Sequence, residues 1–115
     1  MGNERNPQGQ PICLEPRIPT VTRMLKEAGY ATGHFGKWHL GQGEGTPGPG
    51  GLGIDSHRTT NSDGPKFADK NDPYFRAHSS RLIADESIRF IEQHRDRPFY
   101  LNAWFLVPHA TLIKV

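Results

Sequence analysis

The sequence predicts an α/β fold in which helix-strand units surround a mostly parallel sheet. A helix pattern followed almost at once by a strand pattern occurs twice, first over 20–37 and again over 79–107. The second strand pattern is a near-continuous apolar run, which is typical of a strand buried on both faces. Because repeated helix-strand units assemble into layers around a sheet, these observations indicate a partial α/β structure.

The composition allows one small domain with a modest core. The chain has 115 residues, of which 34% are apolar, with 13 glycines, 10 prolines and a net charge of +2. That apolar fraction indicates much loop, and so small a charge gives no reason to expect nucleic acid as a partner. No apolar run approaches the roughly 18 residues of a membrane helix, and no signal peptide is seen at the polar N-terminus. The single cysteine excludes an internal disulfide.

The first helix-strand unit follows a lead-in over 1–17 that is rich in Asn, Gln, Pro and Gly, which we expect to be flexible and without core residues. Thr20 has a side chain suited to an N-cap, and Gly29 is placed to end the helix. Between them, apolar residues at helical spacing predict an amphipathic stripe: Val21, Met24, Leu25 and Ala28. The strand is predicted over Tyr30–Lys37.

The middle of the chain predicts a long irregular loop over 41–78, within a single domain over 18–115. Residues 41–53 alone hold seven glycines and two prolines, and the polar run that follows has no periodicity. Loops of this length are uncommon in compact domains and are usually functional or disordered. The sequence allows two interpretations of this loop: it helps to select substrate, or it is a solvated linker.

The second unit begins with a helix from about Ser79. Its apolar stripe consists of Ala84, Ile88 and Ile91, flanked by Ile83 and Phe90. Pro98 prevents the helix from continuing. The apolar run Phe99–Val107 then predicts a buried strand, which ends at Pro108 and His109. His109 would therefore lie at the carboxyl end of a strand, where open α/β sheets bind ligands.

The candidate site is the segment Gly36-Lys37-Trp38-His39-Leu40-Gly41. If this segment is extended, positions i and i+2 point to the same face, so Lys37 and His39 would project side by side. Two hydrogen-bond donors on one face suit an anionic group. Trp38, between them, is predicted to be a packing residue.

That segment, preceded by Gly29-Tyr30-Ala31-Thr32, resembles the second signature of the type I sulfatases of the alkaline phosphatase superfamily. Three further pieces resemble the family in the expected order: Pro19–Ala28, Arg81–Ile91, and Arg97–Asn102 leading to Pro108-His109. Together with the signature segment, they cover most of 16–112. The resemblance implies an internal fragment of the catalytic domain, with a partial alkaline-phosphatase-like sandwich.

The resemblance also supplies roles for three residues. Lys37 matches the lysine that holds the sulfate and the nucleophile, and His39 matches the histidine that hydrogen-bonds the aldehyde-hydrate nucleophile. His109 matches the histidine that contacts the sulfate near the leaving-group oxygen. These three are the candidate catalytic residues, and Lys37 and His109 are the candidate substrate-binding residues.

Two cofactors of the intact family, formylglycine and Ca²⁺, are not expected in this chain. The family makes formylglycine from Cys-x-Pro-x-Arg, whereas Pro16 stands one place late after Cys13, so we interpret Cys13 as an incidental thiol. Four aspartates in the predicted loop are interpreted as solvated rather than as calcium ligands: Asp55, Asp63, Asp69 and Asp72. Four histidines show no metal-binding spacing and are interpreted as structural or exposed: His34, His57, His78 and His94.

The sequence is therefore interpreted as a fragment of a sulfuric ester hydrolase that acts on a sulfated small molecule or carbohydrate and is inactive alone. One alternative is a phosphodiesterase or phosphonate hydrolase of the same superfamily, because phosphate and sulfate esters are both tetrahedral anions. The other is a non-catalytic module that binds sulfated glycans. The sequence indicates neither the particular ester nor the localisation or oligomeric state.

Overall fold

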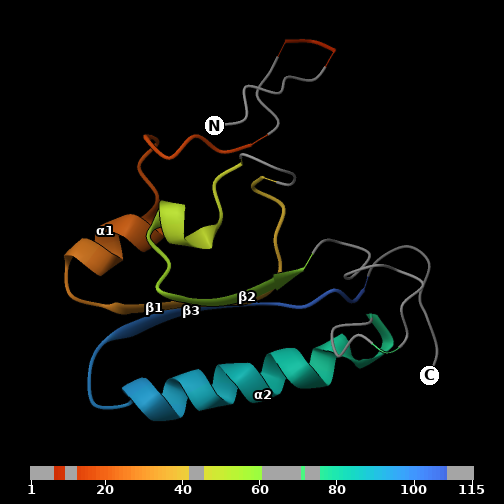
Figure 1. Ribbon diagram of the computed structural model, residues 1–115. Coiled ribbons are helices and arrows are strands. Elements are labelled where there is room, and N and C mark those ends of the chain that lie inside the picture. The colour runs from red at the N-terminus through yellow and green to blue at the C-terminus, as the bar shows by residue number, and fades with distance from the viewer. Residues whose placement is uncertain (1–6, 10–12, 42–45, 61–70, 72–75, 109–115) are drawn as a thin grey trace.

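A three-stranded parallel sheet forms the centre of the fold (Figure 1). The computed structural model describes residues 7–9, 13–41, 46–60, 71 and 76–108. Strand β1 (Ala31–Lys37) lies between β2 (Ser56–Thr60) and β3 (Phe99–Trp104), and both neighbours run parallel to it. The predicted α/β class with a parallel sheet is thus confirmed. Because the strands are parallel, their carboxyl ends meet at one edge.

Helices cover both faces of this sheet (Figure 1). The long helix α2 (Arg76–His94) packs on one face, against β1 and β3. The short helix α1 (Val21–Glu27) and the 3₁₀ turn η1 (Pro49–Leu52) lie on the opposite face. The result is a three-layer arrangement in which β1 is enclosed from both sides, as its burial over six of seven positions shows.

Two apolar clusters, one on each face, hold the layers together. Under α2 the buried members are Ala31, Phe35, Ile83 and Phe90. On the other face they are Trp38, Leu52 and Ile54, with Leu14 and Leu40 packed against them. The Leu14 amide also donates to the Leu40 carbonyl at 2.8 Å. The prediction that residues 1–17 contain no core residue is therefore wrong at Leu14, because a single apolar side chain in a polar segment shows no periodicity.

Helix α1 has the predicted limits but not the predicted buried face. The Thr20 hydroxyl accepts from the Arg23 amide at 3.2 Å, and Gly29 follows the helix with φ of 91°. However, Val21 and Met24 are 54% and 62% exposed, whereas Thr22 is buried. The reason is that the Thr22 hydroxyl donates to the Leu52 carbonyl at 2.6 Å, so the helix docks on η1 through a hydrogen bond rather than an apolar stripe.

The irregular loop predicted for 41–78 is wrong over a large part of its length. It contains η1 and β2, and α2 begins at Arg76. Strand β2 has the sequence Ser-His-Arg-Thr-Thr, without alternating apolar residues, so no local pattern indicates it. It forms because its backbone pairs with β1, in a register that places Ser56 opposite Gly33.

Helix α2 presents a different side to the sheet from the one predicted. Ile83 and Phe90 are buried, whereas Ile88 and Ile91 of the predicted stripe are 54% and 39% exposed. Phe90 approaches β1 at Gly33, where an added Cβ would lie 2.9 Å from the aromatic ring. The missing side chain of Gly33 therefore makes the room for the ring, and this close approach sets the rotation of the helix.

Strand β3 is shorter and less buried than predicted. It ends at Trp104 rather than at Val107, and its residues are half-buried to exposed. In the part of the sheet that the structure describes, β3 is an edge strand, which explains why it is not covered on both faces. The apolar residues Phe105 and Val107 continue beyond the strand and are exposed.

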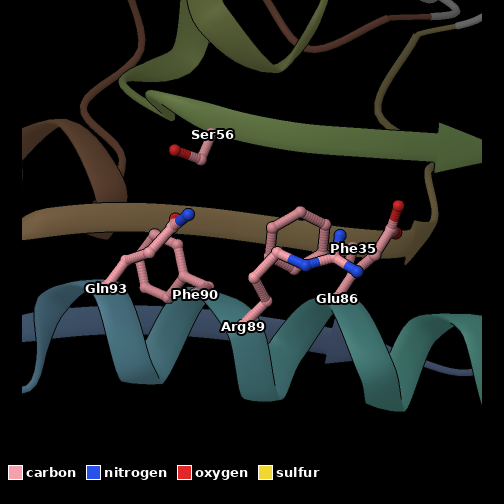
Figure 2. Close-up of a pocket in the computed structure, with 6 residues that line it drawn as sticks. All are labelled: Phe35, Ser56, Glu86, Arg89, Phe90 and Gln93. Atoms are coloured by element: carbon pink, nitrogen blue, oxygen red, sulfur yellow. The ribbon is translucent and has the colours of Figure 1, made fainter.

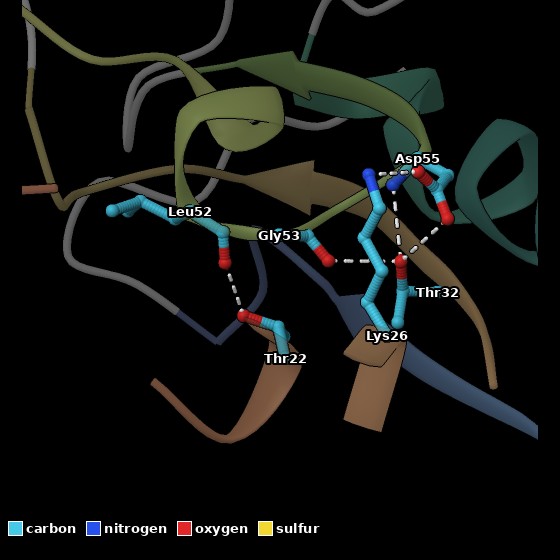
Figure 3. Close-up of polar contacts among 6 residues, drawn as sticks. All are labelled: Thr22, Lys26, Thr32, Leu52, Gly53 and Asp55. Carbon is cyan, nitrogen blue, oxygen red and sulfur yellow. Dashed lines mark hydrogen bonds and ion pairs between the residues drawn. The ribbon is translucent and has the colours of Figure 1, made fainter. Parts of the chain in front are cut away.

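A polar network joins the crossover between β1 and β2 to the rest of the fold (Figure 3). The Thr32 hydroxyl donates to the Gly53 carbonyl at 2.9 Å and accepts from the Asp55 amide at 3.1 Å. Asp55 also pairs with Lys26 of α1, with 2.6 Å between the charged atoms. The Lys26 hydrogen bond is the main cause that lowers the pKa of Asp55. Thr32 thus links β1, the crossover and, through Asp55, α1.

Replacing Thr32 by valine removes these hydrogen bonds while keeping the side-chain shape. We expect the free energy of unfolding to fall by about 1–3 kcal/mol, because the buried Gly53 carbonyl loses its partner. Urea unfolding monitored by circular dichroism measures this loss. The matched control is Thr59→Val on β2, since Thr59 makes no side-chain hydrogen bond within the described ranges. Equal stability of the two variants would contradict the role of Thr32.

Candidate active site at the carboxyl edge of the sheet

Lys37 lies at the carboxyl end of β1, the central strand. The register places it opposite Thr60, the last residue of β2, and places the preceding Gly36 opposite Trp104, the last residue of β3. All three strands therefore end at the edge where Lys37 stands. Parallel α/β sheets bind ligands at this edge. Lys37 is half-buried, so part of the residue is accessible at this edge.

Gly36 provides the backbone geometry immediately before Lys37. Its φ is 110°, a region that favours glycine, and a Cβ added there would lie 2.0 Å from the Trp104 carbonyl oxygen. No other residue fits this position without moving the backbone of β3. The first glycine of the motif is thus needed for β1 and β3 to approach each other where Lys37 leaves the sheet.

His39 lies beyond the strand and is exposed. Strand β1 ends at Lys37, and the Trp38 amide turns to donate to the Thr60 carbonyl at 2.7 Å. The strand alternation used to predict a shared face for Lys37 and His39 therefore does not extend to His39. The prediction for Trp38 is confirmed, since its side chain is buried in the apolar cluster with Leu52.

The third candidate, His109, lies outside the described residues. The described chain reaches Pro108, four positions after the end of β3. Because β3 runs parallel to β1, the segment that leads to His109 leaves the sheet at the same edge as Lys37. The fold thus brings Lys37 and the start of the Pro-His segment to one edge, although they are far apart in sequence.

His34 is the residue of this region that sequence reasoning left without a functional role. Its side chain is 0% exposed and packs edge-on against Trp38 and Trp104, with ring centroids 5.1 and 4.7 Å away. Its Nε2 donates to the Lys37 carbonyl at 2.8 Å, and its Nδ1 is buried with no hydrogen-bond partner among the described residues. The available signal was the strand alternation, which places His34 on the same inward face as Thr32.

Burial lowers the pKa of His34 below its ordinary value of 6.5, because the charged imidazole is poorly solvated. The hydrogen bond to Lys37 acts in the opposite direction, and the charge of His57, its register partner on β2, lowers the pKa further. The folded chain therefore favours the neutral ring. The contribution of neutral His34 to the stability of the folded chain is complete at a pH above the pKa that His34 has in the unfolded chain. It is lost as the pH falls through that pKa toward the lower pKa of His34 in the folded chain.

We accordingly expect the 115-residue chain to lose stability as the pH falls from 7.5 to 5, above the range in which Asp55 takes up a proton, because the hydrogen bond from Lys26 lowers the pKa of Asp55. Urea unfolding at several pH values measures the slope. In His34→Gln the slope over this range should become smaller, whereas His57→Gln, which changes an exposed histidine, should keep most of it. A wild-type slope unchanged by His34→Gln would contradict the assignment.

The described residues do not fit the calcium ion that the resemblance implies. They contain no group of three or more His, Cys, Asp or Glu side chains that could hold a metal ion. Asp55 is paired with Lys26 and precedes β2, so it lies at the opposite edge of the sheet from Lys37. Three of the aspartates considered above lie outside the described residues: Asp63, Asp69 and Asp72.

Cys13 is half-buried and lies close to the end of the motif, since a Cβ added at Gly41 would be 3.1 Å from the Cys13 Cβ. This proximity accompanies the hydrogen bond between Leu14 and Leu40. The motif that makes formylglycine is still one residue out of register at Cys13, so no catalytic step is assigned to it.

A separate hollow of about 170 Å³ lies between α2 and the sheet (Figure 2), and Lys37 is not among its lining residues. Phe35 and Phe90 form its apolar side, and polar side chains complete the lining: Ser56, Glu86, Arg89 and Gln93. Neither of the two described site residues, Lys37 and His39, lines it. The carboxylate of Glu86, the acidic residue of this lining, forms an ion pair with Arg58 at 3.0 Å.

Comparison with known proteins agrees with the motif at this edge. The sulfatase family profile matches residues 2–113. An N-acetylgalactosamine-6-O-sulfatase of Bacteroides thetaiotaomicron is 43% identical over 56 residues, which cover 49% of this chain and 10% of that protein. An arylsulfatase of Hemicentrotus pulcherrimus is 31% identical over 123 aligned residues, which cover 83% of this chain and 22% of that protein. This chain belongs to the sulfatase family.

The chain thus spans about a tenth and about a fifth of the length of these two relatives. In the described part of the chain, no helix is long and apolar enough to cross a membrane. The match confirms the family that the motif resembles.

Proposed function

We propose that this sequence forms part of a sulfatase catalytic domain that hydrolyses sulfate esters, with Lys37 as the cation that holds the sulfate. The observation that carries the proposal is the position of Lys37 at the carboxyl end of the central parallel strand. A fixed ammonium group there stabilises the negative charge on the non-bridging oxygens as the S–O bond breaks. The names of the two relatives, an arylsulfatase and an N-acetylgalactosamine-6-O-sulfatase, favour an aryl or a carbohydrate sulfate as substrate.

In this proposal His39 hydrogen-bonds the nucleophile, and His109 contacts the sulfate near the leaving-group oxygen. His39 is exposed two positions after Lys37, which agrees with contact to a ligand at this edge. We place the formylglycine nucleophile and the calcium ligands of the family outside this sequence, since neither Cys13 nor Asp55 suits them. The 115-residue chain alone is therefore expected to have no turnover.

The proposal is tested with the full-length protein that contains this sequence. Its kcat/KM is measured on 4-nitrophenyl sulfate and on 4-nitrophenyl phosphate esters under identical conditions. A preference for the sulfate ester supports the proposal, whereas a preference for phosphate diesters or phosphonates supports the alternative hydrolase of the same superfamily.

A second assay uses the 115-residue chain with added calcium. Absence of turnover is the expected result, and turnover that Lys37→Ala abolishes would show that the chain is a complete enzyme. Salt-sensitive binding of the isolated chain to a sulfated polysaccharide, without turnover by the full-length protein, would instead support the glycan-binding alternative.

A further inference from the structure

We propose that His34 is a positioning residue for Lys37. Its neutral imidazole donates the Nε2 hydrogen to the Lys37 carbonyl and thereby fixes the backbone from which the Lys37 side chain projects at the carboxyl edge. The inference rests on the proposed function of Lys37 as the sulfate-binding cation. It assigns a role to a buried histidine that touches neither the sulfate nor the reacting atoms.

The hydrogen bond between His34 and the Lys37 carbonyl spans the last four residues of β1. His34 and Lys37 are three residues apart, and Gly36 between them has φ of 110°, so the backbone departs from regular strand geometry just before Lys37. Ladder pairing with β2 ends at Lys37 and Thr60. A partly buried carbonyl at such a position needs a partner. His34 Nε2 is this partner, at 2.8 Å. A side-chain hydrogen bond therefore satisfies the Lys37 carbonyl at the end of the sheet.

Two tryptophans hold the imidazole ring in this orientation. Trp38 follows Lys37 directly, and Trp104 is the last residue of β3. Both meet the ring close to edge-on, with interplanar angles of 87° and 73°. Because the ring is 0% exposed and enclosed by the two indoles, it cannot turn away without repacking them. The donor atom is therefore fixed relative to both β1 and β3.

The same surroundings favour one protonation state. A carbonyl can only accept, so Nε2 carries a hydrogen, while Nδ1 is buried and has no partner in the part of the chain that the structure describes. A second hydrogen at Nδ1 would place an unpaired donor and a charge in a buried site. The groups that carry or gain positive charge next to His34 are Lys37, on its own strand, and His57, opposite it on β2. The charge of His57 disfavours the charged ring, whereas the hydrogen bond to the Lys37 carbonyl favours it. Burial has the larger effect, so the neutral Nε2–H form is the one that orients Lys37.

Two substitutions at His34 separate positioning from packing. His34→Phe keeps an aromatic ring between the tryptophans but has no donor. His34→Gln loses the ring but places an amide N–H at nearly the same reach as Nε2. If His34 positions Lys37, the donor decides activity. If it only fills space, activity follows the stability of each variant, and glutamine is the worse replacement.

The experiment measures kcat/KM for 4-nitrophenyl sulfate, together with the thermal midpoint, for the full-length protein and both variants. We expect His34→Phe to lower kcat/KM about 10- to 100-fold, because displacement of a catalytic group by about 1 Å costs rate of this order. His34→Gln should remain within about 5-fold of the wild type, since it restores the donor. Equal activity of the two variants, or a larger loss in His34→Gln, would overturn the inference.

Lys37→Ala, alone and combined with His34→Phe, separates this inference from the proposed function. If Lys37→Ala leaves activity unchanged, the role of Lys37 fails, and that of His34 with it. If Lys37→Ala is inactive while His34→Phe is fully active, only the inference fails. Once Lys37 is absent, His34→Phe should cause no further loss, since it acts through Lys37.

The wild-type 115-residue chain provides a test that needs no variant. Nitrogen-15 spectra of labelled histidine distinguish the two neutral tautomers and the charged ring. A neutral His34 with the hydrogen on Nε2 at pH 7 supports the inference, and a ring that is charged or protonated on Nδ1 at that pH contradicts it. This measurement keeps the inference testable even if both substitutions prevent folding.

Discussion

Replacing Gly36 by alanine should abolish folding of the chain. The added Cβ would lie 2.0 Å from the Trp104 carbonyl oxygen and 2.8 Å from Ile83 Cδ1, and the backbone φ of 110° is unfavourable for any residue with a side chain. The positive φ alone costs on the order of 1–3 kcal/mol. The contact with the β3 backbone adds to this, because a strand must move rather than a flexible side chain. We expect a total loss of more than about 4 kcal/mol, an exceptional value for one substitution.

Circular dichroism and thermal unfolding of the 115-residue chain measure this effect. Gly48→Ala is the matched control, because Gly48 has φ of −79° and a Cβ there meets no atom within 4 Å. That change should be neutral or slightly stabilising. If Gly36→Ala kept a folded spectrum and a thermal midpoint close to that of Gly48→Ala, the close approach of β1 and β3 beside Lys37 would be wrong.

Replacing Lys37 by alanine should remove most of the activity of the full-length protein without unfolding it. Lys37 is half-buried at the end of β1 and belongs to neither apolar cluster, so the fold does not depend on its side chain. Loss of one fixed group that stabilises developing negative charge costs about 100- to 1,000-fold in rate. We expect a decrease of this size in kcat/KM on an aryl sulfate.

Arg95→Ala is the control for the loss of one positive charge. Arg95 is exposed between α2 and β3, and therefore lies at the amino edge of the sheet, opposite to Lys37. Its removal should change kcat/KM by less than about 3-fold, because surface charges at that distance are largely screened. Similar losses in both variants would indicate a general electrostatic effect rather than a site at Lys37.

Sequence patterns predicted the elements that depend on local signals. The Thr20 cap and the stop at Gly29 limit α1, and the predicted strand Tyr30–Lys37 differs from β1 by one residue. Tyr30 is excluded because its amide donates to the Leu25 carbonyl at the end of the helix. These features require only neighbouring residues, so one stretch of sequence is sufficient to indicate them.

Features that depend on distant partners were missed. Strand β2 is polar, and it forms only because its backbone pairs with that of β1. Helix α1 contacts η1 through the Thr22 hydroxyl, which bonds to a residue 30 positions away in sequence. The helix faces were predicted on the assumption that apolar stripes point inward. Here a hydroxyl on α1 and the absent side chain of Gly33 under α2 determine which faces are buried.

In the candidate site, too, some residues could be predicted from local sequence and others depend on distant partners. Lys37 could be selected from the motif, and the parallel sheet explains why its position suits a ligand. The importance of His34 could not be read from the sequence, because its burial requires Trp104, which is 70 positions away on β3. The positions of His39 and His109 relative to Lys37 stay predictions.

The most direct test of the sulfate site is the position of a bound sulfate in a crystal structure of the full-length protein. We expect a sulfate oxygen about 2.7–2.9 Å from Lys37 Nζ, the usual length of a charge-assisted hydrogen bond, at the carboxyl edge of the β2-β1-β3 sheet. A sulfate bound elsewhere, with the Lys37 side chain extended into solvent, would contradict the assignment of this edge as the active site.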